Sequence, residues 1–93
     1  INLNQWQHVA VTWNGGTNRT TSVTFYVNGS AIAQGAGGTN CTGGIAADDS
    51  SQFIGALPPD PTTNEFDGLI DEVRIYNRVL TADEVKRLYQ MGR

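Results

Sequence analysis

The chain has 93 residues, a formal net charge of −3 and a charged fraction of only 16%. A chain of this length makes one domain at most and buries roughly 60–65% of its unfolded surface. Its scattered Lys and Arg residues form no basic cluster, which argues against a nucleic-acid partner. No apolar run approaches the roughly 20 residues of a membrane-spanning helix, so we expect no membrane insertion. The composition, rich in Gly, Thr and Asn, is typical of extracellular β-sandwich proteins.

The sequence shows neither an initiating Met nor a signal peptide, so we expect an excerpt from a longer protein. Cys41 is the single cysteine of the chain and cannot form an internal disulfide. An odd cysteine in a secreted protein is either an inert free thiol or pairs with a cysteine elsewhere. The sequence leaves both alternatives open.

The N-terminal part of the chain predicts a strand followed by a hairpin. Residues 5–13 alternate with period two and place Val9, Val11 and Trp13 on one face of a strand. A polar connector, residues 14–21, leads to a second predicted strand, residues 22–27. The dipeptide Asn28-Gly29 then favours a type I′ turn, and residues 30–34 can return as the partner strand.

The middle of the chain is less regular. Residues 35–51 have no periodicity and predict a long surface loop. Residues 52–56 predict a short strand, whereas the three prolines of residues 57–65 exclude a central strand. A long strand is predicted from Leu69 onward because β-branched and aromatic residues follow it.

The C-terminal segment predicts a short helix that covers an apolar surface. Thr81 is its expected N-cap and Glu84 completes a capping box. Leu80 and Val85 are placed for a hydrophobic staple, and Gly92 is expected in the left-handed C′ conformation. The apolar stripe of the helix is Val85, Leu88 and Tyr89.

Four segments in this order, WQHVAVTWNG, VTFYVNG, FIG and FDGLIDEVRIYNRVLTADEVKRLY, resemble the C-terminal half of a laminin-G-like module. These modules belong to the concanavalin A-like lectin/glucanase superfamily. The resemblance implies that residues 1–93 are half of a single domain. The implied fold is all-β, a partial antiparallel jelly-roll β-sandwich with one short C-terminal α-helix.

The resemblance also implies that strands facing and flanking those present are missing. Trp6 or Trp13, Phe25 and Val73 would then lie against solvent, although the family counterpart of Trp6 packs in the core. Exposed edges and apolar patches favour association. We therefore expect the isolated chain to be unstable, or to pair with another copy or with the missing half.

An acidic run, Glu65, Asp67, Asp71 and Glu72, resembles the paired carboxylates of a retaining glucanase. Leu69 and Ile70 interrupt the tight pattern that those enzymes keep, so we predict that the chain is not an enzyme. His8 is the single histidine, and the chain offers no companion ligands for zinc. We expect His8 to pack between strands.

Asp71 shares its strand parity with Leu69 and Val73, which predicts an inward-facing carboxylate. Such a group must accept backbone hydrogen bonds, pair with Arg74 or Arg78, or bind a metal. The resemblance implies a structural Ca²⁺ as one possibility, because many relatives carry one near the last strand. The remaining candidate ligands are Asp48 and Asp49.

Trp13 and Tyr26 are the candidate ligand-binding residues, because aromatic faces stack on sugar rings. Trp13 lies near a loop rim, but its phase with Val9 and Val11 favours burial. The resemblance implies a non-catalytic recognition module, a lectin-like carbohydrate-binding domain of a secreted or cell-surface protein. The alternatives are a structural or adhesive spacer that binds an extracellular protein, and a fragment of a glucanase-like enzyme domain.

Overall fold

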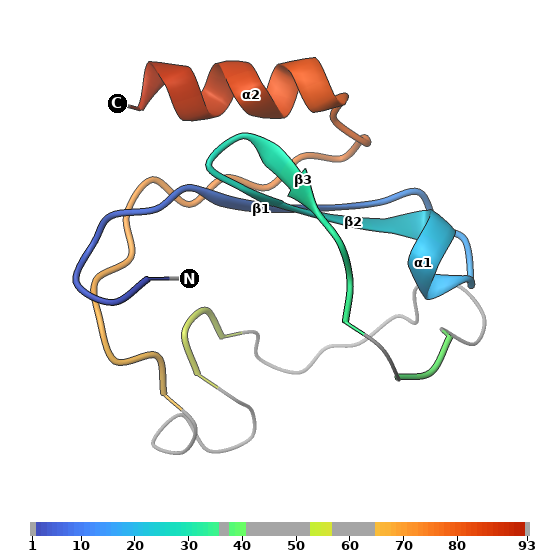
Figure 1. Ribbon diagram of the computed structural model, residues 1–93, viewed down its shortest axis with the longest axis horizontal. Coiled ribbons are helices and arrows are strands. Elements are labelled where there is room, and N and C mark those ends of the chain that lie inside the picture. The colour runs from blue at the N-terminus through green and yellow to red at the C-terminus, as the bar shows by residue number, and fades with distance from the viewer. Residues whose placement is uncertain (1, 36–37, 41–52, 57–64, 93) are drawn as a thin grey trace. The chain divides into compact units, whose positions relative to one another are not determined.

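The computed structural model of the chain describes residues 2–35, 38–40, 53–56 and 65–92. In these ranges it holds a three-stranded antiparallel sheet and a ten-residue helix (Figure 1). This partial sheet with one C-terminal helix confirms the predicted fold class. The strands, in sheet order, are β1 (Val9–Trp13), β2 (Val23–Val27) and β3 (Ser30–Ile32). The helices are a single turn, α1 (Arg19–Ser22), and α2 (Ala82–Met91).

The chain divides into two compact units. One unit combines Ile1–Ile45 with Tyr76–Arg93 and holds all five elements, and the other is Ala46–Ile75. None of the helices in the described part is long and apolar enough to cross a bilayer.

The β2–β3 hairpin forms as the sequence predicts. Asn28 and Gly29 have φ values of 52° and 80°, the two positive angles that a type I′ turn requires. Asn28 also ties the hairpin to the chain before β1, because the His8 N–H donates to its Oδ1 (3.0 Å) and its own N–H donates to the His8 carbonyl (2.8 Å). The turn is therefore held from both sides, and the register places Val27 opposite Ser30.

The connector between β1 and β2 contains α1, which the sequence did not predict. Asn18 caps this turn, because its Oδ1 accepts hydrogen bonds from the N–H and the hydroxyl of Thr20 (3.0 and 2.7 Å). Gln34 after β3 donates to the carbonyls of Arg19 (2.6 Å) and Val23 (2.7 Å), and it accepts from the Arg19 guanidinium (2.9 Å). These bonds fasten the end of the hairpin to the connector.

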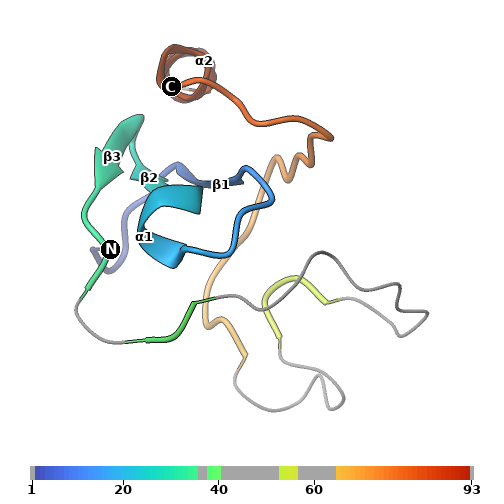
Figure 2. The ribbon, with the colours of Figure 1, turned by 90° about the vertical axis from the view of Figure 1, so that its right-hand side faces the viewer.

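Helix α2 covers one face of the sheet, as the two views in Figures 1 and 2 show. Under it lies a small core in which Tyr26 from β2 is 7% exposed and Val85 from the helix is fully buried. Leu80, just before the helix, is buried with them, while Ala10 and Leu88 pack against the cluster. The buried positions confirm the predicted apolar stripe and place both residues of the predicted staple in one cluster.

The two ends of α2 differ in how well the sequence predicted them. The N-terminus carries the expected capping box between Thr81 and Glu84. The prediction for Gly92 is wrong, since its φ is −85° and not positive. Its N–H donates to the Leu88 carbonyl (3.2 Å), so the last turn closes without a left-handed residue.

The opposite face of the sheet is open in the described structure. Val9 and Val11 on β1 are 58% and 61% exposed, Phe25 on β2 is 42% exposed, and Ile32 on β3 is 48% exposed. The predicted alternation is thus confirmed, but the apolar residues that it groups lie against solvent. Trp6, whose family counterpart packs in the core and which was expected against solvent where the facing strands are missing, is 67% exposed.

The predicted long strand from Leu69 is wrong for this structure, because residues 65–79, all described, contain no strand. Leu69 and Ile75 are 78% and 89% exposed. An extended segment becomes a strand only where a neighbour supplies the ladder hydrogen bonds. The predicted short strand, residues 52–56, is also absent, because the described residues 53–56 form a bend. The Phe66 N–H donates a hydrogen bond to the Gly55 carbonyl of this bend (2.7 Å).

Candidate functional site

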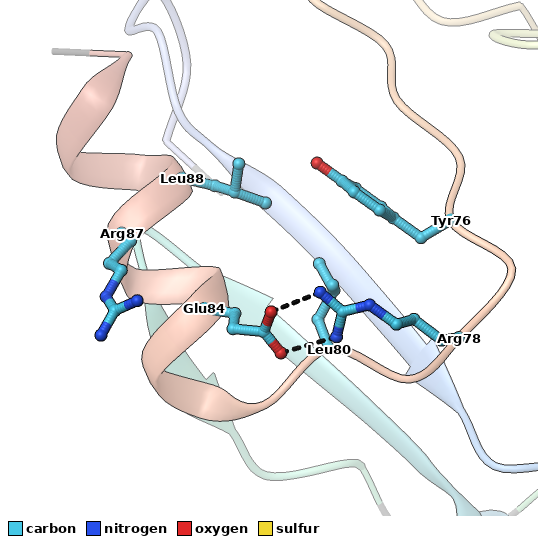
Figure 3. A pocket seen from close by; sticks show the side chains of 6 residues that line it. All are labelled: Tyr76, Arg78, Leu80, Glu84, Arg87 and Leu88. Carbon is cyan, nitrogen blue, oxygen red and sulfur yellow. Dashed lines mark hydrogen bonds and ion pairs between the residues drawn. The ribbon is translucent and has the colours of Figure 1, made fainter.

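A shallow depression lies beside the first turns of α2, within the unit that holds the sheet (Figure 3). It has a volume of about 190 Å³, which is below the roughly 300 Å³ at which small-molecule pockets begin. The depression can therefore hold only part of a ligand. Its lining residues are Tyr76, Arg78, Leu80, Glu84, Arg87 and Leu88.

The polar centre of the depression is a bidentate pair between Arg78 and Glu84. The Arg78 Nη1 and Nη2 donate to Glu84 Oε1 (2.8 Å) and Oε2 (2.5 Å). The Thr81 N–H also donates to Glu84 Oε1 (3.0 Å), and the Thr81 hydroxyl accepts from the Glu84 N–H (3.2 Å). One carboxylate thus fixes the helix cap and the chain segment that leads into it.

These hydrogen bonds set the charge state of the site. The guanidinium of Arg78 and the backbone N–H of Thr81 lower the pKa of Glu84 to about 2. The carboxylate of Glu84 in turn raises the pKa of Arg78. Glu84 is therefore ionised at ordinary pH. A general acid in glycoside hydrolysis needs the opposite shift, so Glu84 does not supply one.

The sequence analysis assigned a role to Arg78 and to Glu84 separately, but it did not predict the contact between them. It assigned Glu84 to the capping box, which is confirmed, and Arg78 to a possible pair with Asp71. The two residues are six positions apart across the N-cap, a spacing outside the i, i+3 and i, i+4 pairs of a helix. The pair depends on how the chain enters the helix, which no spacing rule predicts.

Trp13 stands at the end of β1, where the chain enters the connector. Its indole Nε1–H donates to the Gly16 carbonyl (2.8 Å), and the Gly16 N–H donates to Asn14 Oδ1 (2.9 Å). The ring is half-buried and its one polar group is used within the protein. Trp13 can offer a ligand only ring surface.

The proposal of Tyr26 as a sugar-stacking residue is wrong, because its ring lies in the core under α2. His8 was expected to pack between strands, but its half-buried ring lies beside helix α2, 6.2 Å from the ring of Tyr89, measured between centroids.

Asp71 is exposed, so the predicted inward-facing carboxylate is also wrong. Its Oδ1 accepts a hydrogen bond from the N–H of Glu72 (2.8 Å), a residue with φ of 52°. This contact joins two adjacent residues and is consistent with the alternative in which Asp71 accepts backbone hydrogen bonds.

The described residues do not fit the Ca²⁺ site that the resemblance implies. Among them, no group of three or more His, Cys, Asp or Glu side chains could hold a metal ion. Asp71 alone is far short of the 6–8 oxygen ligands that Ca²⁺ takes. Asp48 and Asp49 lie outside the described residues. Calcium binding stays a prediction.

Comparisons with known proteins agree with the antiparallel sheet and the C-terminal helix of this structure. The family model of the concanavalin A-like lectin/glucanases superfamily, in its laminin-G form, matches residues 1–86, and the chain belongs to this family. It is similar to a crystal structure of residues 221–444 of an S-layer domain-containing protein from Clostridium thermocellum ATCC 27405. The two chains are 30% identical with a TM-score of 0.67. The match covers 96% of this chain and 41% of the other. No curated protein gives a significant match.

Proposed function

We propose that this chain is part of a non-catalytic, carbohydrate-binding module of an extracellular or cell-surface protein. The observation that carries the proposal is the match of residues 1–86 to a family of lectins and glucanases. The similar S-layer domain-containing protein supports a place at the cell surface.

Among the aromatic side chains of the described structure, Tyr76 and Trp13 are the ones that we propose for contact with a sugar ring. Tyr76 borders the depression beside α2 and is 43% exposed, next to the planar guanidinium of Arg78. Trp13 keeps part of its ring free at the end of β1. Sugar sites combine an aromatic face with a few fixed polar groups, and the rigid Arg78–Glu84 pair provides such groups beside Tyr76.

Affinity electrophoresis through gels that contain soluble polysaccharides, such as β-glucan, xylan and mannan, tests this function. We expect the protein to be retarded by at least one polysaccharide. Tyr76→Ala or Trp13→Ala should weaken the binding about tenfold or more while the protein stays folded. Met91→Ala, at the far end of the helix and 73% exposed, is the control and should bind normally.

Other outcomes would contradict the proposal. Absence of retardation by every polysaccharide would favour a spacer that binds an extracellular protein. Release of reducing sugar from a retarding polysaccharide would show an enzyme and overturn the non-catalytic part.

A further inference from the structure

The chain contains two Asn-Gly dipeptides that lie in different settings. Asn14-Gly15 follows β1, and Asn28-Gly29 joins β2 to β3. An Asn that precedes Gly is chemically labile, because the Gly nitrogen can attack the Asn side-chain amide and no Cβ stands in its way. The two dipeptides are alike in sequence, so a difference in their reactivity must come from the surrounding structure.

Asn28-Gly29 is held on both sides. The His8 N–H donates to Asn28 Oδ1 (3.0 Å), and the Asn28 N–H donates to the His8 carbonyl (2.8 Å). Gly29 lies against α2, since a Cβ placed on it would be 3.1 Å from Tyr89 Cδ2. Closing a ring between the Asn28 side chain and the Gly29 nitrogen requires rotations about the bonds of the Asn28 Cα. At this turn those rotations would break hydrogen bonds and move the hairpin against the helix.

Asn14-Gly15 is exposed and has room to react. Within the described residues, no atom beyond its chain neighbours lies within 4 Å of a Cβ placed on Gly15. The Asn14 N–H donates to the Ser22 carbonyl (3.1 Å), which anchors the chain before the reacting atoms and not after them. The Gly16 N–H donates to Asn14 Oδ1 (2.9 Å), the oxygen on which negative charge develops during the attack. A donor already placed at that oxygen stabilises the charge.

We propose that Asn14 is a site of spontaneous deamidation and that the hairpin protects Asn28 from the same reaction. The Gly15 nitrogen loses its proton to hydroxide and forms a bond with Asn14 Cγ, and the side-chain nitrogen leaves as ammonia. Water then opens the cyclic imide at either of its carbonyl carbons. The products are aspartate and isoaspartate, and no oxidant or reductant takes part.

The modification would change the end of β1. Either product adds a negative charge next to Trp13. In isoaspartate the main chain is also longer by a methylene group between Trp13 and Gly16, whose carbonyl accepts the indole N–H (2.8 Å). Deamidation should therefore alter how the Trp13 ring is held. The proposal concerns the covalent state of this loop and does not depend on a carbohydrate ligand.

Peptide mapping by mass spectrometry tests the proposal on the full polypeptide, incubated at one mildly alkaline pH both folded and in urea. Trypsin cleavage after Arg19 separates the two asparagines. In the folded protein we expect Asn14 to convert at least about tenfold faster than Asn28, because conversion of Asn28 waits for local opening of the hairpin. In urea the two should convert at similar rates. Gly15→Ala should slow Asn14 and leave Asn28 unchanged, because the new Cβ shields the attacking nitrogen.

Three results would overturn the proposal. One is conversion of Asn14 in the folded protein that is no faster than that of Asn28. Another is the same large difference between the two asparagines in urea, because the local sequence would then be its cause. The third is an unchanged rate at Asn14 in Gly15→Ala.

Discussion

The covered and the open face of one sheet differ although they share the same three strands. Tyr26 and Phe25 are neighbours on β2, yet Tyr26 is 7% exposed under α2 and Phe25 is 42% exposed. The helix that covers Tyr26 is specified by local features, a cap, a staple and an apolar stripe. No such element covers Phe25 within the described residues. The alternation of side chains along a strand therefore tells which residues share a sheet face. It does not tell which other segment, such as α2, covers that face.

The largest expected effect comes from removing an aromatic ring on each face. Tyr26→Ala should destabilise the 93-residue chain by roughly 3–5 kcal/mol, because the ring is lost from a packed core. Phe25→Ala should cost only about 1 kcal/mol there, chiefly through strand propensity. Urea unfolding followed by circular dichroism measures both. Equal costs would mean that the two faces are buried alike.

The contact between the hairpin and α2 gives the next effect. In Gly29→Ala, at φ of 80°, the new Cβ would lie 3.1 Å from Tyr89 Cδ2 and 3.3 Å from Lys86 Cα. We expect a loss of roughly 1–3 kcal/mol from backbone strain, together with disturbed helix packing. Gly15→Ala, at φ of 87° with no atom within 4 Å of the new Cβ, is the matched control. Thermal unfolding should show Gly29→Ala as the less stable variant, and the reverse order would argue against close docking of the helix.

The cap of α2 should contribute less than the core beneath it. Thr81→Ala removes the side chain that accepts the Glu84 N–H and should cost about 1 kcal/mol. Thr81→Ser keeps a hydroxyl and should restore most of the stability. Chemical denaturation measures both variants, and an unchanged midpoint for Thr81→Ala would show that the helix does not depend on its cap.

The smallest effect is a pH dependence that tests the Arg78–Glu84 pair. The pKa of Glu84 in the folded protein, about 2, lies below the usual 4.5. The stabilisation that the ionised Glu84 gives the folded protein is therefore complete above about pH 4.5 and is lost as the pH falls through about 2. Carboxyl NMR titration should show the pKa of Glu84 rising toward 4.5 in Arg78→Gln. Arg87→Gln, whose side chain points away from Glu84 (Figure 3), should leave it near 2; equal pKa values in both variants would contradict the pair.

Features with a local cause were predictable from the sequence. The Asn28-Gly29 turn needs only two residues that tolerate positive φ, and the α2 cap needs only Thr81 and Glu84. Alternation likewise placed Val9, Val11 and Trp13 on one face of β1. Each of these depends on residues that are near in sequence or opposite in a hairpin.

Features that depend on distant partners were not predictable. Asp71 was placed facing inward by strand parity, but parity has meaning only where a strand forms, and residues 65–79 contain none. Tyr26 was offered as a ligand residue because its aromatic chemistry suits sugars, yet the helix buries it. The Arg78–Glu84 pair crosses the N-cap and needed the geometry of the chain entering α2.

The central claim is that α2 covers one face of the sheet, whereas the described residues leave the face of Val9, Val11 and Phe25 exposed. It is tested most directly by the thiol reactivity of two neighbouring positions, Ala10→Cys and Val11→Cys, each made in a Cys41→Ser background. The account predicts that Val11→Cys reacts with iodoacetamide at least about tenfold faster than Ala10→Cys, because burial limits reaction to open states. Equal rates would contradict it.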